Sequence, residues 1–132
     1  MEIDSNIRIL VVDDSLVMRR IVRNHLRAIG FESVIEAGGG REALRILEGE
    51  KIDLVLSDWC MHGMHGIEVL RATREREATR DIPFIMVTAE AQPHLILEAM
   101  QARVSDYVIK PFTRDDLRES IEKVFRERGG EG

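Results

Sequence analysis

Short apolar runs alternate with longer segments of helical periodicity along the whole chain. The apolar runs fall at residues 9–12, 33–37, 54–56, 83–87 and 107–109, as expected for short strands buried in a sheet. Each run is followed by apolar residues at helical spacing, for example Met18, Val22 and Leu26 after the first one. Regular alternation of this kind predicts an α/β fold, with a mostly parallel five-stranded sheet and five helices covering both of its faces.

The predicted elements begin and end at residues with matching local preferences. Gly30 ends the first helix, and Pro93 suits the first turn of the fourth, where its missing N–H is not needed. Thr113 and Asp116 form a capping-box pattern at the start of the last helix, which Gly129-Gly130 is expected to end. No linker, repeat or low-complexity segment intervenes, so residues 1–132 are predicted to form a single domain.

Composition narrows the class of protein. The 132 residues are 44% hydrophobic and 33% charged, which is typical of a globular domain. No apolar stretch approaches the roughly 20 residues that span a bilayer, and the N-terminus lacks a signal-peptide pattern, so we expect a cytoplasmic protein. A net charge of −5 argues against nucleic-acid binding. A single cysteine, Cys60, excludes an internal disulfide.

The polar residues that directly follow the apolar runs carry the chemistry. Ligands of an open parallel sheet bind beyond the carboxyl ends of its strands. Asp13 and Asp14 follow the first run, Asp58 the third, Thr88 ends the fourth and Lys110 follows the fifth. Although a single one of these residues is more often a cap or a solvated side chain, the five together predict a site at this edge of the sheet.

Three clustered carboxylates repel one another and therefore favour a bound cation. Oxygen ligands completed by water suit Mg²⁺ better than Zn²⁺. Lys110 and the Thr88 hydroxyl are suited to contact phosphate oxygens, and a carboxylate is a known nucleophile for phosphoryl transfer. The site is therefore predicted to bind Mg²⁺ and to accept a phosphoryl group.

The sequence resembles the response-regulator receiver domain, and in particular the stand-alone chemotaxis type, over roughly residues 7–127. The motifs that carry the resemblance are Leu10-Val-Val-Asp-Asp-Ser15, Met18-Arg-Arg-Ile-Val-Arg23, Ser57-Asp-Trp59, Met86-Val-Thr-Ala-Glu-Ala91 and Tyr107-Val-Ile-Lys-Pro-Phe112. The resemblance implies a flavodoxin-like doubly wound domain with strand order 2-1-3-4-5. It also implies a cis Lys110-Pro111 peptide bond.

The resemblance assigns roles to the strand-end residues. Asp58 is implied to be the phosphoacceptor, with Mg²⁺ held by Asp13, Asp14, Asp58 and the backbone carbonyl of Cys60. Lys110 and Thr88 are implied to contact the phosphoryl group. A histidine kinase or a small acyl phosphate would be the donor.

The resemblance further implies a switch rather than an enzyme with an external substrate, catalysing only its own phosphorylation and slow autodephosphorylation. Thr88 and Tyr107 are implied to report phosphorylation to a surface formed by the fourth helix, the fifth strand and the fifth helix. A protein target, for which the flagellar switch is one candidate, would bind there. The chain is expected to act as a monomer, with no nucleic-acid or membrane partner.

The loop after Asp58 departs from the usual receiver pattern. His62 and His65 stand where receivers commonly carry other residues, and Cys60 replaces the usual asparagine of the chemotaxis type. Cys60, His62 and Glu90 are therefore expected to modulate the lifetime of the phosphoryl group. As an alternative use of the same loop, Cys60, His62 and His65 are soft ligands suited to a transition metal.

Two further residues depart from expectation. Arg103 replaces the usual glycine at the end of the fourth helix, where a left-handed backbone is expected to cost about 1 kcal/mol. His25 lies on the apolar stripe of the first helix, where we interpret it as a packing residue rather than a phosphorelay histidine.

Competing functions remain open from the sequence. An aspartate-nucleophile phosphatase would need a second Asp two residues after the nucleophile, which neither Asp13-Asp14-Ser15 nor Asp58-Trp59-Cys60 supplies. A flavodoxin-like cofactor binder would need backbone donors and hydroxyls, not two carboxylates, after the first strand. A receiver module of a phosphorelay or of a larger regulator is the third alternative, for which the tail at 129–132 would begin a linker.

Overall fold

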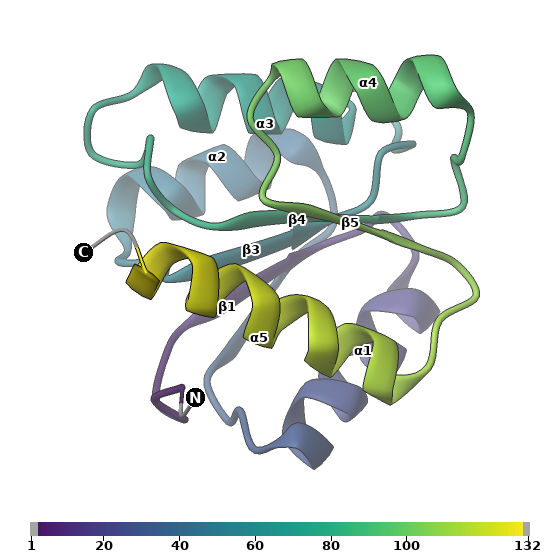
Figure 1. Cartoon of the computed structure of the whole chain (residues 1–132). Helices are drawn as coiled ribbons and strands as arrows, with labels where there is room; N and C mark the ends of the chain where they lie inside the picture. The colour runs from purple at the N-terminus through teal and green to yellow at the C-terminus, as the bar shows by residue number, and fades with distance from the viewer. Residues whose placement is uncertain (1–2, 131–132) are drawn as a thin grey trace.

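The computed structural model describes residues 3–130, in which five strands alternate with five helices (Figure 1). The strands are β1 (Ile9–Val12), β2 (Val34–Ala37), β3 (Leu54–Ser57), β4 (Phe84–Thr88) and β5 (Asp106–Ile109). The helices are α1 (Leu16–Ile29), α2 (Gly40–Gly49), α3 (Gly66–Glu75), α4 (Pro93–Gln101) and α5 (Arg114–Gly130). All strand pairs are parallel and the order is β2-β1-β3-β4-β5, which confirms the predicted fold class and strand order.

Helices cover both faces of the sheet, which explains why the strands are apolar on both sides (Figure 1). Ile9 and Val11 of β1 belong to a core cluster with Val22 and Leu26 of α1 and with buried residues of α5. The alternate residues of β1, Leu10 and Val12, belong to the second cluster, together with buried residues of α2, α3 and α4. Successive side chains of a strand point to opposite faces, so a continuous apolar run supplies both cores.

The strand order places the candidate site. The chain runs from β1 to β2 on one side of the sheet and then returns to β3 on the other side of β1. The loops that leave β1 and β3 therefore diverge at the carboxyl edge, where ligands of doubly wound sheets bind. Asp13 and Asp14 lie in the first of these loops and Asp58 in the second.

Several local predictions are confirmed. Pro93 is in the first turn of α4, and the Lys110–Pro111 peptide bond is cis. The capping box of α5 is present, since the Thr113 N–H donates to Asp116 Oδ2 (2.9 Å) and the Asp116 N–H donates to Thr113 Oγ1 (3.0 Å). Arg103 has a left-handed backbone, with φ of 66°.

The end of the last helix differs from the prediction. Helix α5 includes the two glycines at 129 and 130 instead of ending before them, because glycine in a helix costs only about 1 kcal/mol relative to alanine. The remaining tail residues 131–132, considered above as the start of a linker, lie outside the described residues. His25 is half-buried and its ring packs edge-on against Phe112 at 5.8 Å between centroids, in agreement with a packing role.

No helix within residues 3–130 combines the length and the apolar character needed to cross a membrane.

Candidate functional site

Lys110 joins two aspartates at the carboxyl edge of the sheet. Its Nζ lies 3.1 Å from Asp13 Oδ2 and 3.4 Å from Asp58 Oδ2. The three side chains are 15%, 7% and 12% exposed, in the order Lys110, Asp13, Asp58. They come from the ends of β5, β1 and β3, and Lys110 is separated from the two aspartates by 97 and 52 positions in the sequence. The fold alone therefore brings this charged group together.

The backbone holds both aspartates in place. Asp13 Oδ1 accepts a hydrogen bond from the Ser15 N–H (2.9 Å), at the N-cap of α1. The Asp13 carbonyl accepts from Arg19 Nη1 (2.6 Å), and Arg19 Nε in turn donates to Glu36 (3.1 Å). Asp58 Oδ1 accepts from the Trp59 N–H (2.7 Å). Each carboxylate thus has one oxygen hydrogen-bonded to a backbone N–H and the other oxygen next to Lys110 Nζ.

Asp14 has a different partner. Its Oδ2 accepts from the His62 N–H (2.9 Å) and lies 2.7 Å from His62 Nδ1. These contacts, the backbone one first, lower the pKa of the Asp14 carboxyl below its ordinary value. The His62 ring is fully exposed, so the loop after β3 reaches across to the loop after β1 through solvent-accessible groups.

The charge of this group suits a divalent cation, although the side chains do not converge as a preformed metal site. Two carboxylates, Asp13 and Asp58, face the Lys110 ammonium, and Asp14 adds a third carboxylate at the same edge, so the negative charges outnumber the positive one. Within residues 3–130, no group of three or more His, Cys, Asp or Glu side chains is arranged to hold a metal ion. The oxygen donors nevertheless fit Mg²⁺ in chemistry.

Glu90 connects the remaining predicted residues. Its N–H donates to the buried Thr88 Oγ1 (3.2 Å), and its carbonyl accepts from the Tyr107 hydroxyl (2.6 Å). Its carboxylate accepts from Cys60 Sγ (3.1 Å). The hydrogen bond to Glu90, together with burial, raises the pKa of the Cys60 thiol to about 11. Burial, followed by the charge of Glu90, raises the pKa of Tyr107 to about 12.

The potential transition-metal ligands of the loop have separate partners in this structure, and the transition-metal hypothesis stays a prediction. Cys60 binds Glu90, and His62 binds Asp14. His65 Nδ1 accepts from the Met61 N–H (3.2 Å), next to the start of α3. Because each potential ligand has a different partner, no metal-binding group forms from them among the described residues.

Sequence reasoning missed two residues that shape the site. A Cβ at Gly66 would lie 2.0 Å from the Asp58 carbonyl oxygen, so only glycine allows α3 to begin this close to the end of β3. Arg19 fixes the Asp13 carbonyl, as described above. Gly66 had a weak signal as one of two glycines in the loop, whereas nothing in the sequence pattern pairs Arg19 with the backbone of Asp13.

Comparison with known proteins agrees with this geometry. The sequence profile of the response regulator receiver domain matches residues 9–122. The chain is 48% identical over 123 residues to "Chemotaxis protein CheY" of Pseudomonas aeruginosa, covering 93% of this chain and 99% of that protein. It is 45% identical over 123 residues to "Chemotaxis protein CheY-3" of Vibrio cholerae, covering 93% and 95% respectively.

Solved structures share the fold. The crystal structure of chemotaxis protein CheY4 of Vibrio cholerae superposes with a TM-score of 0.84 at 30% identity, covering 90% of this chain and 98% of that one. A CheY-like receiver domain protein from Methanospirillum hungatei superposes with a TM-score of 0.87 at 29% identity, covering 96% and 99%. By its sequence, its strand order and its length, the chain belongs to the response regulator receiver domain family, and within it to the chemotaxis (CheY) type.

Proposed function

We propose that the chain is a phosphorylation-activated response regulator whose Asp58 accepts a phosphoryl group. The observation that carries this proposal is the position of Lys110 Nζ between Asp13 and Asp58. An acidic pair with a cation at its centre matches the needs of phosphoryl transfer, which depends mainly on positioning and charge neutralisation. Asp13 has the same arrangement, and Asp58 is the proposed nucleophile because its side chain is the more exposed of the two, at 12% against 7%, and because the receiver family assigns the role to this position.

The proposed reaction follows from this arrangement. An oxygen of the Asp58 carboxylate attacks the phosphorus of the donor and forms an acyl–phosphate bond. The bond from phosphorus to the donor breaks, and its electron pair leaves with the imidazole of a histidine kinase or with the carboxylate of an acyl phosphate. Lys110, already within 3.4 Å of Asp58, neutralises the charge of the incoming phosphoryl oxygens. The Thr88 hydroxyl is proposed to donate to a second oxygen.

Mg²⁺ is the proposed cofactor. Asp13, Asp14, Asp58 and the Cys60 carbonyl are its proposed ligands, which supply only oxygen atoms. When bound, the ion offsets the excess negative charge and polarises phosphoryl oxygens. Asp14 is a suitable ligand because an aspartate carboxyl is ionised near neutral pH, and the side chain of His62, its present partner, is fully exposed to solvent.

Glu90 supports a proposed path from the site to the surface. The Thr88 hydroxyl now accepts from the Glu90 N–H, whose carbonyl binds the Tyr107 hydroxyl. If Thr88 turns its hydroxyl toward a phosphoryl group, that hydrogen bond is strained or lost, and the segment bonded to Tyr107 shifts with it. Cys60 binds the Glu90 carboxylate, so the loop after β3 is tied to the same residue. Cys60, His62 and Glu90 are therefore proposed to set the phosphate lifetime.

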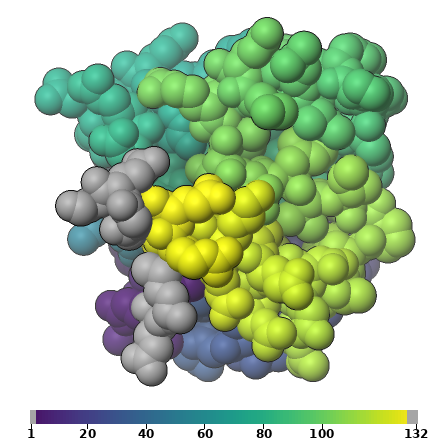
Figure 2. Space-filling view, viewed as in Figure 1, coloured from purple at the N-terminus to yellow at the C-terminus, as the bar shows by residue number. Residues whose placement is uncertain are grey.

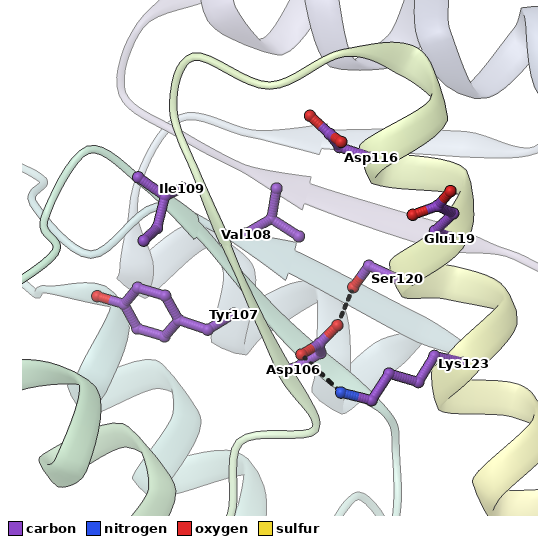
Figure 3. Close-up of a pocket in the computed structure, with 8 residues that line it drawn as sticks. All are labelled: Asp106, Tyr107, Val108, Ile109, Asp116, Glu119, Ser120 and Lys123. Carbon is purple, nitrogen blue, oxygen red and sulfur yellow. Dashed lines mark hydrogen bonds and ion pairs between the residues drawn. The ribbon is translucent and has the colours of Figure 1, made fainter.

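The surface of α4, β5 and α5 is the proposed docking site for a target. Figure 3 shows Ser120 and Lys123 of α5 turned toward Asp106, while Tyr107 points to the other side of β5. Ser120 Oγ donates to Asp106 (2.6 Å), and Lys123 Nζ lies 3.5 Å from it. These polar groups line a hollow that also exposes Ile109. By analogy with the CheY relatives, we propose a role in chemotaxis, with a histidine kinase as donor and the flagellar switch as a candidate target.

Intact-protein mass spectrometry after incubation with acetyl phosphate and Mg²⁺ tests the central claim. A mass gain of one phosphoryl group is expected, and both chelation of Mg²⁺ and Asp58→Asn should abolish it. Asp115→Asn is the matched control, because Asp115 is an exposed aspartate in the first turn of α5 and should leave the gain unchanged. Phosphorylation that persists in Asp58→Asn, or its absence in folded wild-type protein with either donor class, would refute the proposal.

A further inference from the structure

A basic hollow lies at the edge of the sheet opposite the candidate phosphorylation site. It has a volume of about 400 Å³ and is bounded by the end of α3, the segment before β4, the turn between α4 and β5, and the last part of α5 (Figure 2). Four arginines contribute to its lining: Arg74, Arg80, Arg103 and Arg128. Asp81 and Glu127 are the acidic residues that line it. The hollow therefore carries an excess of positive charge in a chain whose net charge is −5.

None of these four arginines takes part in an ion pair within residues 3–130. Arg71 and Arg76 of the same region, in contrast, pair with Glu98 and Glu48 at 2.6 Å. Arg80, Arg103 and Arg128 therefore keep most of their N–H donors for a ligand, whereas Arg74 uses its donors within the fold. The hollow therefore differs from the neighbouring surface of α3 in having arginines without a carboxylate partner among the described residues.

Arg74 forms the base of the hollow. Its guanidinium donates to the carbonyls of Arg103 (3.0 Å), Arg80 (2.9 Å) and Ile82 (2.6 Å), and so ties three segments together. All three acceptors are neutral, so these hydrogen bonds hold the guanidinium in place without neutralising its charge. Burial, followed by the nearby charge of Arg103, lowers the pKa of Arg74, while the charge of Asp81 acts in the opposite direction.

Arg103 has the left-handed backbone conformation described above, which glycine would adopt without strain. Its Nη2 donates to the Arg74 carbonyl (3.3 Å), which keeps the two guanidinium-bearing side chains side by side. A strained backbone that holds one cation against another is a feature that fold stability does not require. Strain of this kind is concentrated where proteins bind ligands.

We propose that this hollow binds an anion with two or more linked phosphates, such as pyrophosphate or the diphosphate group of a nucleotide. Arginine is well matched to phosphate, because its planar group donates two parallel hydrogen bonds. Arginines from four separate segments line the hollow, an arrangement that fits several phosphates better than one, and the volume lies within the range of small-ligand sites, about 300–1,000 Å³. The net negative charge of the chain disfavours extended nucleic acid as the ligand.

The site is independent of the proposed phosphorylation. Lys110 and its two aspartates lie at the carboxyl ends of the strands, whereas the hollow is lined by residues that precede β4 and β5. Binding is therefore expected in the absence of Mg²⁺ and in Asp58→Asn protein. An experiment that contradicts one of the two proposals therefore does not contradict the other.

Isothermal titration of the full chain with pyrophosphate and, separately, with ADP tests the proposal, with a chelator present to remove Mg²⁺. One-to-one binding of at least one of the two probes is expected. Arg103→Gly and Arg80→Gln should each weaken it by about tenfold, the loss expected for one charge-assisted contact. Arg27→Gln removes an exposed arginine from α1 and should change the affinity less than twofold.

Each result has a defined meaning. Tighter binding of ADP than of pyrophosphate identifies a nucleotide ligand, and equal binding identifies the phosphates alone as the recognised group. Absence of binding for both probes at millimolar concentration overturns the proposal. An equal loss of affinity in Arg27→Gln, or no loss in both Arg103→Gly and Arg80→Gln, also overturns it, because binding would then follow net charge and not this hollow.

Discussion

Gly66→Ala is predicted to damage the candidate site through the backbone. The new Cβ would lie 2.0 Å from the Asp58 carbonyl oxygen and 2.9 Å from its carbonyl carbon, whereas ordinary contact begins at 3.4 Å. These are backbone atoms with no rotamer to change, so α3 or the end of β3 must move by about 1.4 Å, the difference between 3.4 and 2.0 Å. The movement also threatens the 2.8 Å hydrogen bond from the Gly66 N–H to the Trp59 carbonyl.

The magnitude follows from these contacts. Overpacking in a well-packed region costs about 1–3 kcal/mol, and the loss of a hydrogen bond costs about 1 kcal/mol more. We therefore expect the free energy of unfolding to fall by about 3 kcal/mol. With a urea m-value of about 2 kcal/mol/M, the midpoint of unfolding should drop by about 1.5 M. Mg²⁺ affinity should fall as well, since the loop that carries the Cys60 carbonyl follows Asp58 directly.

Urea unfolding followed by circular dichroism measures the loss. Gly49→Ala is the matched control: Gly49 is the last residue of α2, and an added Cβ there would meet no heavy atom within 4 Å. The control should be neutral or stabilising by up to about 1 kcal/mol, because alanine is the better helix former. Titration with Mg²⁺, followed by isothermal titration calorimetry, gives the second readout. A Gly66→Ala protein as stable as the wild type would show that the contact with Asp58 relaxes freely, and would refute the reasoning.

Three further predictions concern single residues. Lys110→Ala should lower the free energy of unfolding by about 2 kcal/mol in the absence of Mg²⁺, because two poorly exposed carboxylates lose their partner. Mg²⁺ should raise the stability of this variant more than that of the wild type. Equal Mg²⁺ effects in thermal melts of the two proteins would contradict this. Arg103→Gly should raise the free energy of unfolding by about 1 kcal/mol, and an unchanged urea midpoint would show that the turn is unstrained. The Cys60 thiol, with its pKa raised to about 11, should react slowly with iodoacetamide at pH 8 and faster up to pH 11. Glu90→Gln should shift this profile to lower pH, and an unshifted profile would remove Glu90 as the cause.

The fold follows closely from the sequence. Strands buried on both faces must be apolar throughout, so the five short runs mark their positions, and the helical spacing between them requires parallel connections. The capping box at Thr113 was predicted because it depends on neighbours within a few positions, whereas the left-handed turn at Arg103 was predicted from the resemblance, since a glycine usually stands there. The ends of α5 and β2 differed by one or two residues, since local preference is weak at the ends of elements.

The candidate site could likewise be predicted only in part from the sequence. The sequence by itself determined which residues gather at one edge, because the carboxyl end of every parallel strand lies there. Only the tertiary structure decided how they pair: that Lys110 joins Asp13 to Asp58, that His62 engages Asp14, and that Glu90 links the switch residues. The reason is that the positions of the strands and their parallel direction are indicated by periodic patterns along the chain, while the strand order was implied by the resemblance to receiver domains. Pairing of side chains across loops depends on distances of about 3 Å between segments that are remote in sequence, to which no periodic pattern corresponds.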